Sequence, residues 1–263
     1  MNPSNPPIRR IELFGIAFDA LDFTQTLDRL IELARGEGNA YAVTANVDHV
    51  VRFHRRPDLR SIYTQADLVT ADGAPVIWAS RLLGSPLPER VAGSDLFPAL
   101  CGRAADEGLS VFLLGGDPGA AEGSVEVLTT RYPKLKAGWF CPRHGFDQYA
   151  DQVQQVIETV RSAQPDILFV ALGSPKQEQW IVNHREACGA KLNIGVGISF
   201  SFLCDQVRRA PMWMRRTGLE WAHRLFQEPG RLWKRYLVDD ALFVPLVARA
   251  MIQRLRTRHG RFR

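Results

Sequence analysis

The side chains best suited to chemistry follow two short apolar runs. The run "AYAVTAN" ends in Thr44 and Asn46, and the run "DLVTAD" ends in Asp72. A carboxylate at the end of a buried strand is rigidly placed to act as a general base, and hydroxyl and amide groups beside it can hold a polar substrate. Because Gly73 follows Asp72, an ordinary Asp-Gly turn stays open as an alternative to a catalytic base.

Glycines gather after three further apolar runs. Gly115 and Gly116 lie in "SVFLLGGDPG", Gly173, Lys176 and Gln177 lie in "DILFVALGSPKQ", and "KLNIGVG" contains two more glycines. Glycine lets a backbone approach a ligand closely, and helix N-termini after such turns can hold phosphate oxygens. Plain strand-to-helix turns remain the alternative. Neither a P-loop nor a complete dinucleotide fingerprint is present, which disfavours a nicotinamide oxidoreductase.

A largely parallel sheet would bring these groups together. Apolar runs alternate with helical patterns, which is typical of βαβ units, and ligands of such sheets lie beyond the carboxyl ends of the strands. The predicted strands are 11–18, 40–46, 67–72, 110–116, 136–140, 166–173 and 191–197. The predicted helices are 23–35, 47–63, 74–84, 94–107, 119–131, 147–163 and 176–187. We therefore expect an α/β fold: a Rossmann-like, mostly parallel sheet with helices on both faces.

The chain changes character after Gly197, and we expect an α/β catalytic core over 8–197 and a helical appendage over 198–263. From residue 208 onward there are 14 Arg and Lys against 4 Asp and Glu, whereas the preceding residues are net acidic. The aromatic residues interleaved with this charge are Trp213, Trp221, Trp233, Tyr236 and Phe243. This pattern favours an anionic membrane surface as a partner, with an ordinary solvated basic face or a nucleic-acid-binding tail as alternatives.

Composition excludes several classes of protein. The 263 residues are 46% hydrophobic and 23% charged, as in a globular protein, and no apolar run reaches the ~20 residues of a membrane span. The four cysteines form no CxxC pair and the N-terminal residues lack a signal-peptide pattern, so we expect buried, reduced thiols in the cytosol. No zinc-binding pattern of histidines is present, and we expect the adjacent Asp239 and Asp240 to be solvated.

Several long motifs occur together in one order: "TANVDHV", "ADGAPVIWASRLLGSPLPERVAGSD", "LLGGDPG", "GSPKQEQW" and "RRAPMWMRRTGLEWAHRLFQEPGRLWKRY". With them, the chain resembles the WecG/TagA/CpsF family of bacterial glycosyltransferases from about residue 11 to 240. The resemblance implies an inverting, metal-independent enzyme without a cofactor. It would move a sugar from a UDP-sugar to an undecaprenyl-diphosphate-linked saccharide at the inner face of the cytoplasmic membrane, in exopolysaccharide, common-antigen or teichoic-acid-linkage synthesis.

The resemblance also implies roles for individual residues. Asp72 falls on the base of the family, and Thr44, Asn46, Arg90 and Gln177 fall on its substrate-binding positions. On the residues alone, a structural salt bridge is an equal alternative for Arg90 in "PERVAGSD". The residues expected to bind the nucleotide or the diphosphates are Gly115, Gly116, Gly173, Lys176, Arg224, Arg231 and Arg235.

One segment departs from the family pattern. The segment "GVGISFSFLCDQ" has Ser201 where the family often has aspartate, and Asp205 near a usual glycine. The donor sugar (glucose, ManNAc or ManNAcA), the acceptor and the oligomeric state therefore stay open. Without the resemblance, the alternative is a basic nucleic-acid-binding or membrane-binding α/β protein that has no transferase activity. A transferase of this kind needs no nucleic-acid partner.

Overall fold

The computed structural model describes residues 8–260, apart from the side chains of Arg216, Arg231 and residues 257–260. Its centre is a six-stranded sheet in the order β4-β3-β8-β7-β5-β6, and every pair is parallel. The strands are β3 (Ala40–Ala45), β4 (Leu68–Ala71), β5 (Ser110–Gly115), β6 (Lys136–Phe140), β7 (Ile167–Ala171) and β8 (Leu192–Gly195). The predicted parallel sheet is confirmed.

Helices cover both faces of this sheet, as expected. They are α1 (Phe23–Arg35), α2 (Val47–Arg55), η1 (Pro57–Leu59), α3 (Ser61–Thr64), α4 (Ala74–Leu82), α5 (Gly93–Glu107), α6 (Ala120–Arg131), η2 (Phe146–Gln148), α7 (Ala150–Ala163), α8 (Lys176–Cys188) and α9 (Ser199–Leu203). Alternate strand residues enter opposite cores: Leu168 and Val170 of β7 pack with α2, α7 and α8, while Phe169 packs with α1, α5 and α6. Because both faces of the sheet are covered, the residues that point to either side are apolar, and the strand sequences are almost wholly apolar as a result.

Two predicted elements are divided in the structure. The expected strand 11–18 is an antiparallel hairpin of β1 (Arg10–Leu13) and β2 (Ile16–Asp19), because Phe14 and Gly15 adopt φ angles of 56° and 77° and reverse the chain. The expected helix 47–63 ends at Arg55, because Pro57 cannot continue it.

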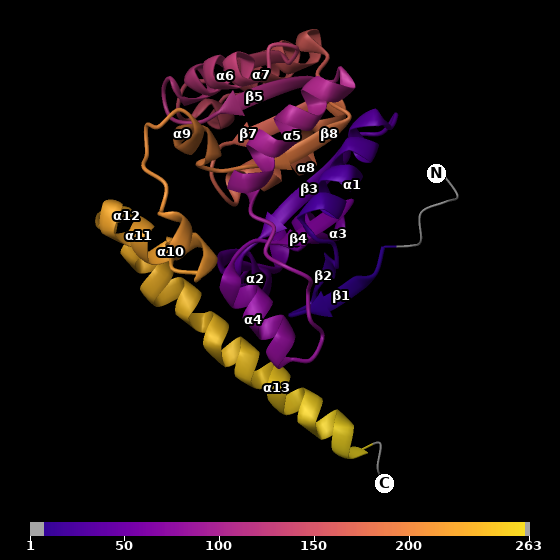
Figure 1. Ribbon diagram of the computed structural model, residues 1–263, viewed down its shortest axis with the longest axis vertical. Coiled ribbons are helices and arrows are strands. Elements are labelled where there is room, and N and C mark those ends of the chain that lie inside the picture. Colours follow the sequence, from indigo (N-terminus) through magenta and orange to yellow (C-terminus); the bar gives the residue numbers. More distant parts are fainter. Residues whose placement is uncertain (1–7, 261–263) are drawn as a thin grey trace.

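The appendage consists of short helices followed by one long helix. They are α10 (Met212–Arg216), α11 (Glu220–Gln227), α12 (Pro229–Lys234), η3 (Arg235–Asp239), η4 (Asp240–Leu242) and α13 (Phe243–Gly260), where η3 is a π-helical turn. Figure 1 shows α10–α12 clustered near α2 and α4, and α13 running past them along the side of the core. No helix among the described residues is long and apolar enough to cross a bilayer.

The appendage packs on the core at defined points. The Phe243 ring meets the Phe14 ring edge-on at 5.3 Å between centroids, and the Arg254 guanidinium donates to the Gly84 carbonyl at 3.3 Å. Phe243 is therefore buried, and the expectation that it joins an exposed aromatic surface is wrong. The division of the chain after residue 197 stays a prediction; α9 lies inside the core, where Phe200 is fully buried.

The described residues contain no disulfide at any of the four cysteines. Cys101 and Cys188 are buried as expected, whereas Cys141 and Cys204 are partly exposed, so the prediction of a core position is wrong for these two. Both lie beside the turns that follow β6 and α9, where the chain reaches the carboxyl edge of the sheet.

Candidate active site

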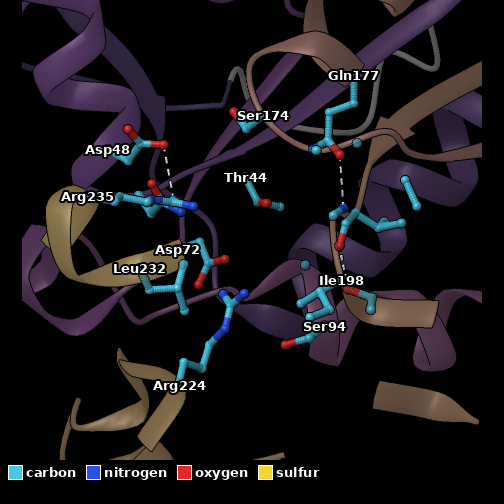
Figure 2. A pocket seen from close by; sticks show the side chains of 18 of the residues that line it. Thr44, Asp48, Asp72, Ser94, Ser174, Gln177, Ile198, Arg224, Leu232 and Arg235 are labelled. Carbon is cyan, nitrogen blue, oxygen red and sulfur yellow. Dashed lines mark hydrogen bonds and ion pairs between the residues drawn. The ribbon is translucent and has the colours of Figure 1, made fainter. Parts of the chain in front are cut away.

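A cavity of about 1000 Å³ opens at the carboxyl edge of the sheet. Loops after each of the six strands β3–β8 line it. The appendage adds Arg224, Leu232 and Arg235 (Figure 2). The predicted site residues that line it are Thr44, Asn46, Asp72, Arg90, Gly115, Gly116, Gly173, Lys176, Gln177, Arg224 and Arg235. Arg231 belongs to α12, and its side chain lies outside the described part of the chain. Residues predicted from separate segments of the sequence thus line one cavity.

Asp72 follows β4 directly and is held by the sheet. Its backbone N–H donates to the Ala45 carbonyl at 2.9 Å, and Gly73 takes a φ of 116° that turns the chain into α4. Burial raises the pKa of Asp72 to about 6; Arg90 opposes this shift, and the carboxylates of Glu220 and Asp95 add to it. A carboxylate with that pKa is ionised at neutral pH yet basic enough to take a proton from a hydroxyl group.

Thr44 and Asn46 lie beside Asp72 because β3 and β4 pair in parallel. Thr44 is opposite Thr70, two residues before Asp72, and its side chain faces Gly93, where an added Cβ would come 3.1 Å from the Thr44 Oγ1. Asn46 caps α2: its Oδ1 accepts from the His49 N–H at 3.3 Å. Among the side chains that the structure describes, none forms a hydrogen bond with its amide nitrogen, which leaves that group for a ligand.

The glycine turns place backbone against the cavity. Gly115, Gly116 and Gly173 have φ angles of 88°, 89° and 77°, which side chains other than glycine rarely adopt. Of the helices that follow, α8 starts at the cavity, where Lys176 and Gln177 line it, whereas α6 starts at Ala120, just after the last lining residue of its turn, Pro118. Lys176 at the start of α8 pairs with Asp147 at 2.6 Å, so part of its charge is already compensated.

Gln177 lines the cavity, yet both ends of its amide are used within the protein. Its Oε1 accepts from the Gly197 N–H at 3.1 Å, and its Nε2 donates to Glu178 Oε1 at 2.7 Å. Gln177 therefore holds the turn after β8 in place. The role of a direct substrate ligand, which the resemblance implies, stays a prediction.

A buried polar network behind this turn was not anticipated. The His49 Nδ1 accepts from the Asn46 N–H, so the proton lies on Nε2, which is 2.9 Å from Ser174 Oγ and 3.6 Å from Glu178 Oε1. Arg52 donates to the same Ser174 oxygen at 2.7 Å. Burial works to raise the pKa of Glu178, but its contacts with His49, Gln177 and Ser174 outweigh burial and lower it. The signal was present, since "TANVDHV" and "SPKQE" both contain these polar residues.

Arg90 is engaged in ion pairs. Its guanidinium lies 3.1 Å from Asp95 and 3.2 Å from Glu220 of the appendage, and Arg209 bridges the same two carboxylates at 2.8 and 3.4 Å. The structural salt bridge that the sequence left open is therefore present. Because Glu220 belongs to the appendage, these ion pairs hold the appendage against the core beside the cavity, next to Asp72.

Two appendage arginines reach into the cavity from opposite sides of Leu232 (Figure 2). Arg235 pairs with Asp48 at 3.0 Å, and its buried Nε has no hydrogen-bond partner. Arg224 stacks over the Phe202 ring at 5.8 Å, and no ion pair involves it within the described residues. Both can therefore offer N–H groups to an anion.

Asp240 and Ser201, which the sequence singled out, both lie at the cavity. Asp240 lines the cavity, and burial together with the nearby Asp48 charge raises the pKa of Asp240 to about 6. The expectation of a solvated Asp240 is therefore wrong. At the other end of the cavity, Ser201 is buried and donates to Asp117 Oδ2 at 2.9 Å. The serine that stands where the family often has aspartate therefore orients a carboxylate after the Gly115–Gly116 turn.

The fold and the cavity define an α/β enzyme of the Rossmann-like class. A sequence profile of the Glycosyl transferase WecG/TagA/CpsF family matches residues 11–257, and the chain belongs to this family. It is a glycosyltransferase, which makes the alternative of a protein without transferase activity wrong.

Three relatives carry the same name, N-acetylglucosaminyldiphosphoundecaprenol N-acetyl-beta-D-mannosaminyltransferase. The protein of Bacillus subtilis (strain 168) is 36% identical over 180 residues, 68% of each chain. That of Bacillus spizizenii is 32% identical over 75% of each chain. That of Staphylococcus aureus (strain MRSA252) is 29% identical over 92% of this chain and 93% of its own.

Proposed function

We propose that this enzyme transfers a sugar from a UDP-sugar to a polyprenyl-diphosphate-linked saccharide in cell-surface polysaccharide synthesis. The names of the relatives support a lipid-diphosphate acceptor. The observation that carries the proposal is Asp72, a carboxylate with a pKa of about 6 at a cavity that arginines enter from the appendage.

Asp72 acts as the general base in this proposal. It takes the proton of the acceptor hydroxyl as that oxygen attacks the anomeric carbon, while UDP leaves from the opposite face and the configuration inverts. Such help contributes ~10²–10⁴-fold in rate. Thr44 and the free amide nitrogen of Asn46 lie beside the base and would orient the sugar rings through hydrogen bonds.

The leaving diphosphate needs positive charge. We propose that guanidinium groups supply it, because planar N–H pairs match phosphate oxygens and cost little reorganisation when charge develops. Arg224 is placed for this at the appendage side, and the turns at Gly115–Gly116 and Gly173 bring the backbone close to the cavity. No metal ion takes part in this scheme.

The appendage also suits the surface of an anionic membrane. Trp213, Trp221 and Trp233 are 61%, 41% and 51% exposed on a segment rich in arginine. Aromatic side chains at headgroup level and cations near anionic lipids favour peripheral binding. We propose binding to the inner face of the cytoplasmic membrane, where a lipid-linked saccharide and a cytosolic donor meet.

A donor screen tests the proposal. Purified enzyme is incubated with GlcNAc-diphosphate-polyprenyl acceptor and, in turn, UDP-glucose, UDP-ManNAc or UDP-ManNAcA, and UDP release and the new glycosidic bond are measured by mass spectrometry and NMR. We expect one donor to be turned over with inversion, in EDTA as well as without it. Release of UDP from none of the three would contradict the proposed function, and loss of turnover in EDTA would contradict its metal-free part.

A further inference from the structure

Next to Asp72, the appendage adds a group of apolar side chains to the cavity wall, beside its charged Glu220, Arg235 and Asp240. Leu232, Tyr236, Leu237, Phe243 and Val244 line the cavity there, from α12, η3 and the start of α13. Polar and glycine-rich loops form the opposite end, beyond β5 and β6, which the sheet order places at the far edge from β4. One cavity thus has a polar, glycine-rich end and an end where apolar side chains stand beside charged ones, with Asp72 near the second.

This apolar wall leads from the interior to the surface. Leu232 and Phe243 are 3% and 7% exposed, whereas Leu237 and Val244 are 58% and 70% exposed. Tyr236 is fixed between them, because its ring lies 6.0 Å from the Trp221 ring and 5.7 Å from the Arg235 guanidinium. Apolar side chains that are buried at the inner end and exposed at the outer end can accept an apolar chain that enters from the surface.

A cationic group stands at the inner end of these apolar side chains. Arg235 directly precedes Tyr236 and Leu237 on the same π-helical turn, its pairing with Asp48 fixes it in the cavity, and its buried Nε lacks a partner. Arg224 enters from the other side of Leu232 (Figure 2). The site therefore offers an anion site next to the base and an apolar path away from it, which is the order of groups in a sugar-diphosphate-lipid.

We propose that Leu237 and Val244, with Leu232 and Tyr236 behind them, bind the first isoprene units of the acceptor lipid. The inference rests on the proposed function and adds a subsite to it. Placed this way, the acceptor diphosphate lies at Arg235, which shares its turn with Tyr236 and Leu237, while Arg224 serves the diphosphate of UDP. The attached sugar then reaches Asp72, and the prenyl chain leaves the enzyme between η3 and α13. The chain length of the acceptor is then read by the enzyme itself and not only by the membrane.

Acceptors of two chain lengths test this inference. GlcNAc-diphosphate is linked to a farnesyl chain or to an ethyl group, and both acceptors are used as monomers without vesicles or detergent. We expect wild-type enzyme to prefer the farnesyl acceptor in kcat/KM. Leu237→Asp and Val244→Asp should lower the farnesyl-to-ethyl ratio by about tenfold, because a charge beside the chain opposes its burial. Both positions are exposed, so folding is preserved, and UDP binding by calorimetry checks this.

A matched control keeps the test specific. Phe226→Asp introduces the same charge on an α11 side chain that is 86% exposed and does not line the cavity. It should leave the farnesyl-to-ethyl ratio within twofold of wild type. An unchanged ratio in Leu237→Asp and Val244→Asp would overturn the subsite. An equal fall in Phe226→Asp would overturn it in favour of a general lipid-binding surface. Absence of transfer to both acceptors by wild-type enzyme would refute the proposed function instead.

Discussion

Replacing Asp72 by asparagine should destroy activity and stabilise the fold at the same time. The substitution keeps the size of the side chain and removes its ability to take a proton. As a general base, Asp72 contributes ~10²–10⁴-fold, so kcat should fall by that factor. The affinity for UDP should stay within twofold, because the diphosphate contacts come from other residues. UDP release and calorimetric titration of UDP measure these two quantities.

The gain in stability follows from the direction of the pKa shift. Folding raises the pKa of Asp72 from 3.8 to about 6, so the folded state favours the protonated carboxyl. The contribution of Asp72 to the free energy of unfolding is therefore greatest below pH 3.8, and it is lost as the pH rises through 6. At ~1.4 kcal/mol per pKa unit the upper bound at pH 8 is about 3 kcal/mol, and solvent in the open cavity reduces it to about 1–2 kcal/mol.

The measurement is the free energy of unfolding in urea at pH 8 and at pH 4. Asp72→Asn should exceed wild type by about 1–2 kcal/mol at pH 8, and by only a few tenths at pH 4, where both side chains are neutral. Asp58→Asn is the control, because Asp58 is exposed and pairs with Arg56; it should give no gain at pH 8. An Asp72→Asn enzyme that keeps more than a tenth of wild-type kcat, or is no more stable at pH 8, would refute the reasoning.

Three other substitutions distinguish residues that bind substrate from residues that stabilise the fold around the site. Arg224→Ala should lower kcat/KM by about 10–100-fold through lost diphosphate contacts, with the unfolding curve unchanged; full turnover with a soluble acceptor would contradict this. Glu178→Gln should cost about 1–3 kcal/mol in urea unfolding at pH 7, because it breaks the buried contacts with His49, and a variant of wild-type stability would show that the network is dispensable. Gly93→Ala should raise the KM severalfold by pushing on Thr44 while the melting temperature stays within a few degrees; unchanged kinetics would place Thr44 outside the site.

Much of the fold was predictable because the strands carry a strong local signal. The buried parallel strands are unbroken apolar runs, and the residues after them are small or polar, which indicates the carboxyl edge of a sheet. The hairpin at Phe14–Gly15 was missed because a non-glycine residue with positive φ leaves little trace in the sequence. The hydrophobic pattern of eight residues is the same whether they form one straight strand or two short strands of a hairpin.

The candidate site was predictable residue by residue but not in its connections. Asp72, Thr44 and Asn46 could be placed at one edge because parallel strands end together. The pairing of Arg90 with Glu220, and of Arg235 with Asp48, could not, because each joins residues far apart in the chain through the docking of the appendage. Local patterns predict which side chains reach an edge, whereas tertiary packing decides which of them remain free.

The contact between Phe14 and Phe243 has a consequence for biosynthesis. It joins the hairpin that precedes the sheet to the first residue of α13, so a segment that is synthesised early packs against one that is synthesised much later. During translation the sheet can form while the appendage is still inside the ribosome, since chains fold from the N-terminal side as they emerge. Until η3 and α13 are released, Asp72 faces open water with neither the arginines nor the apolar wall beside it. The nascent chain is then a folded but catalytically incomplete protein until the appendage has emerged and packed on the core.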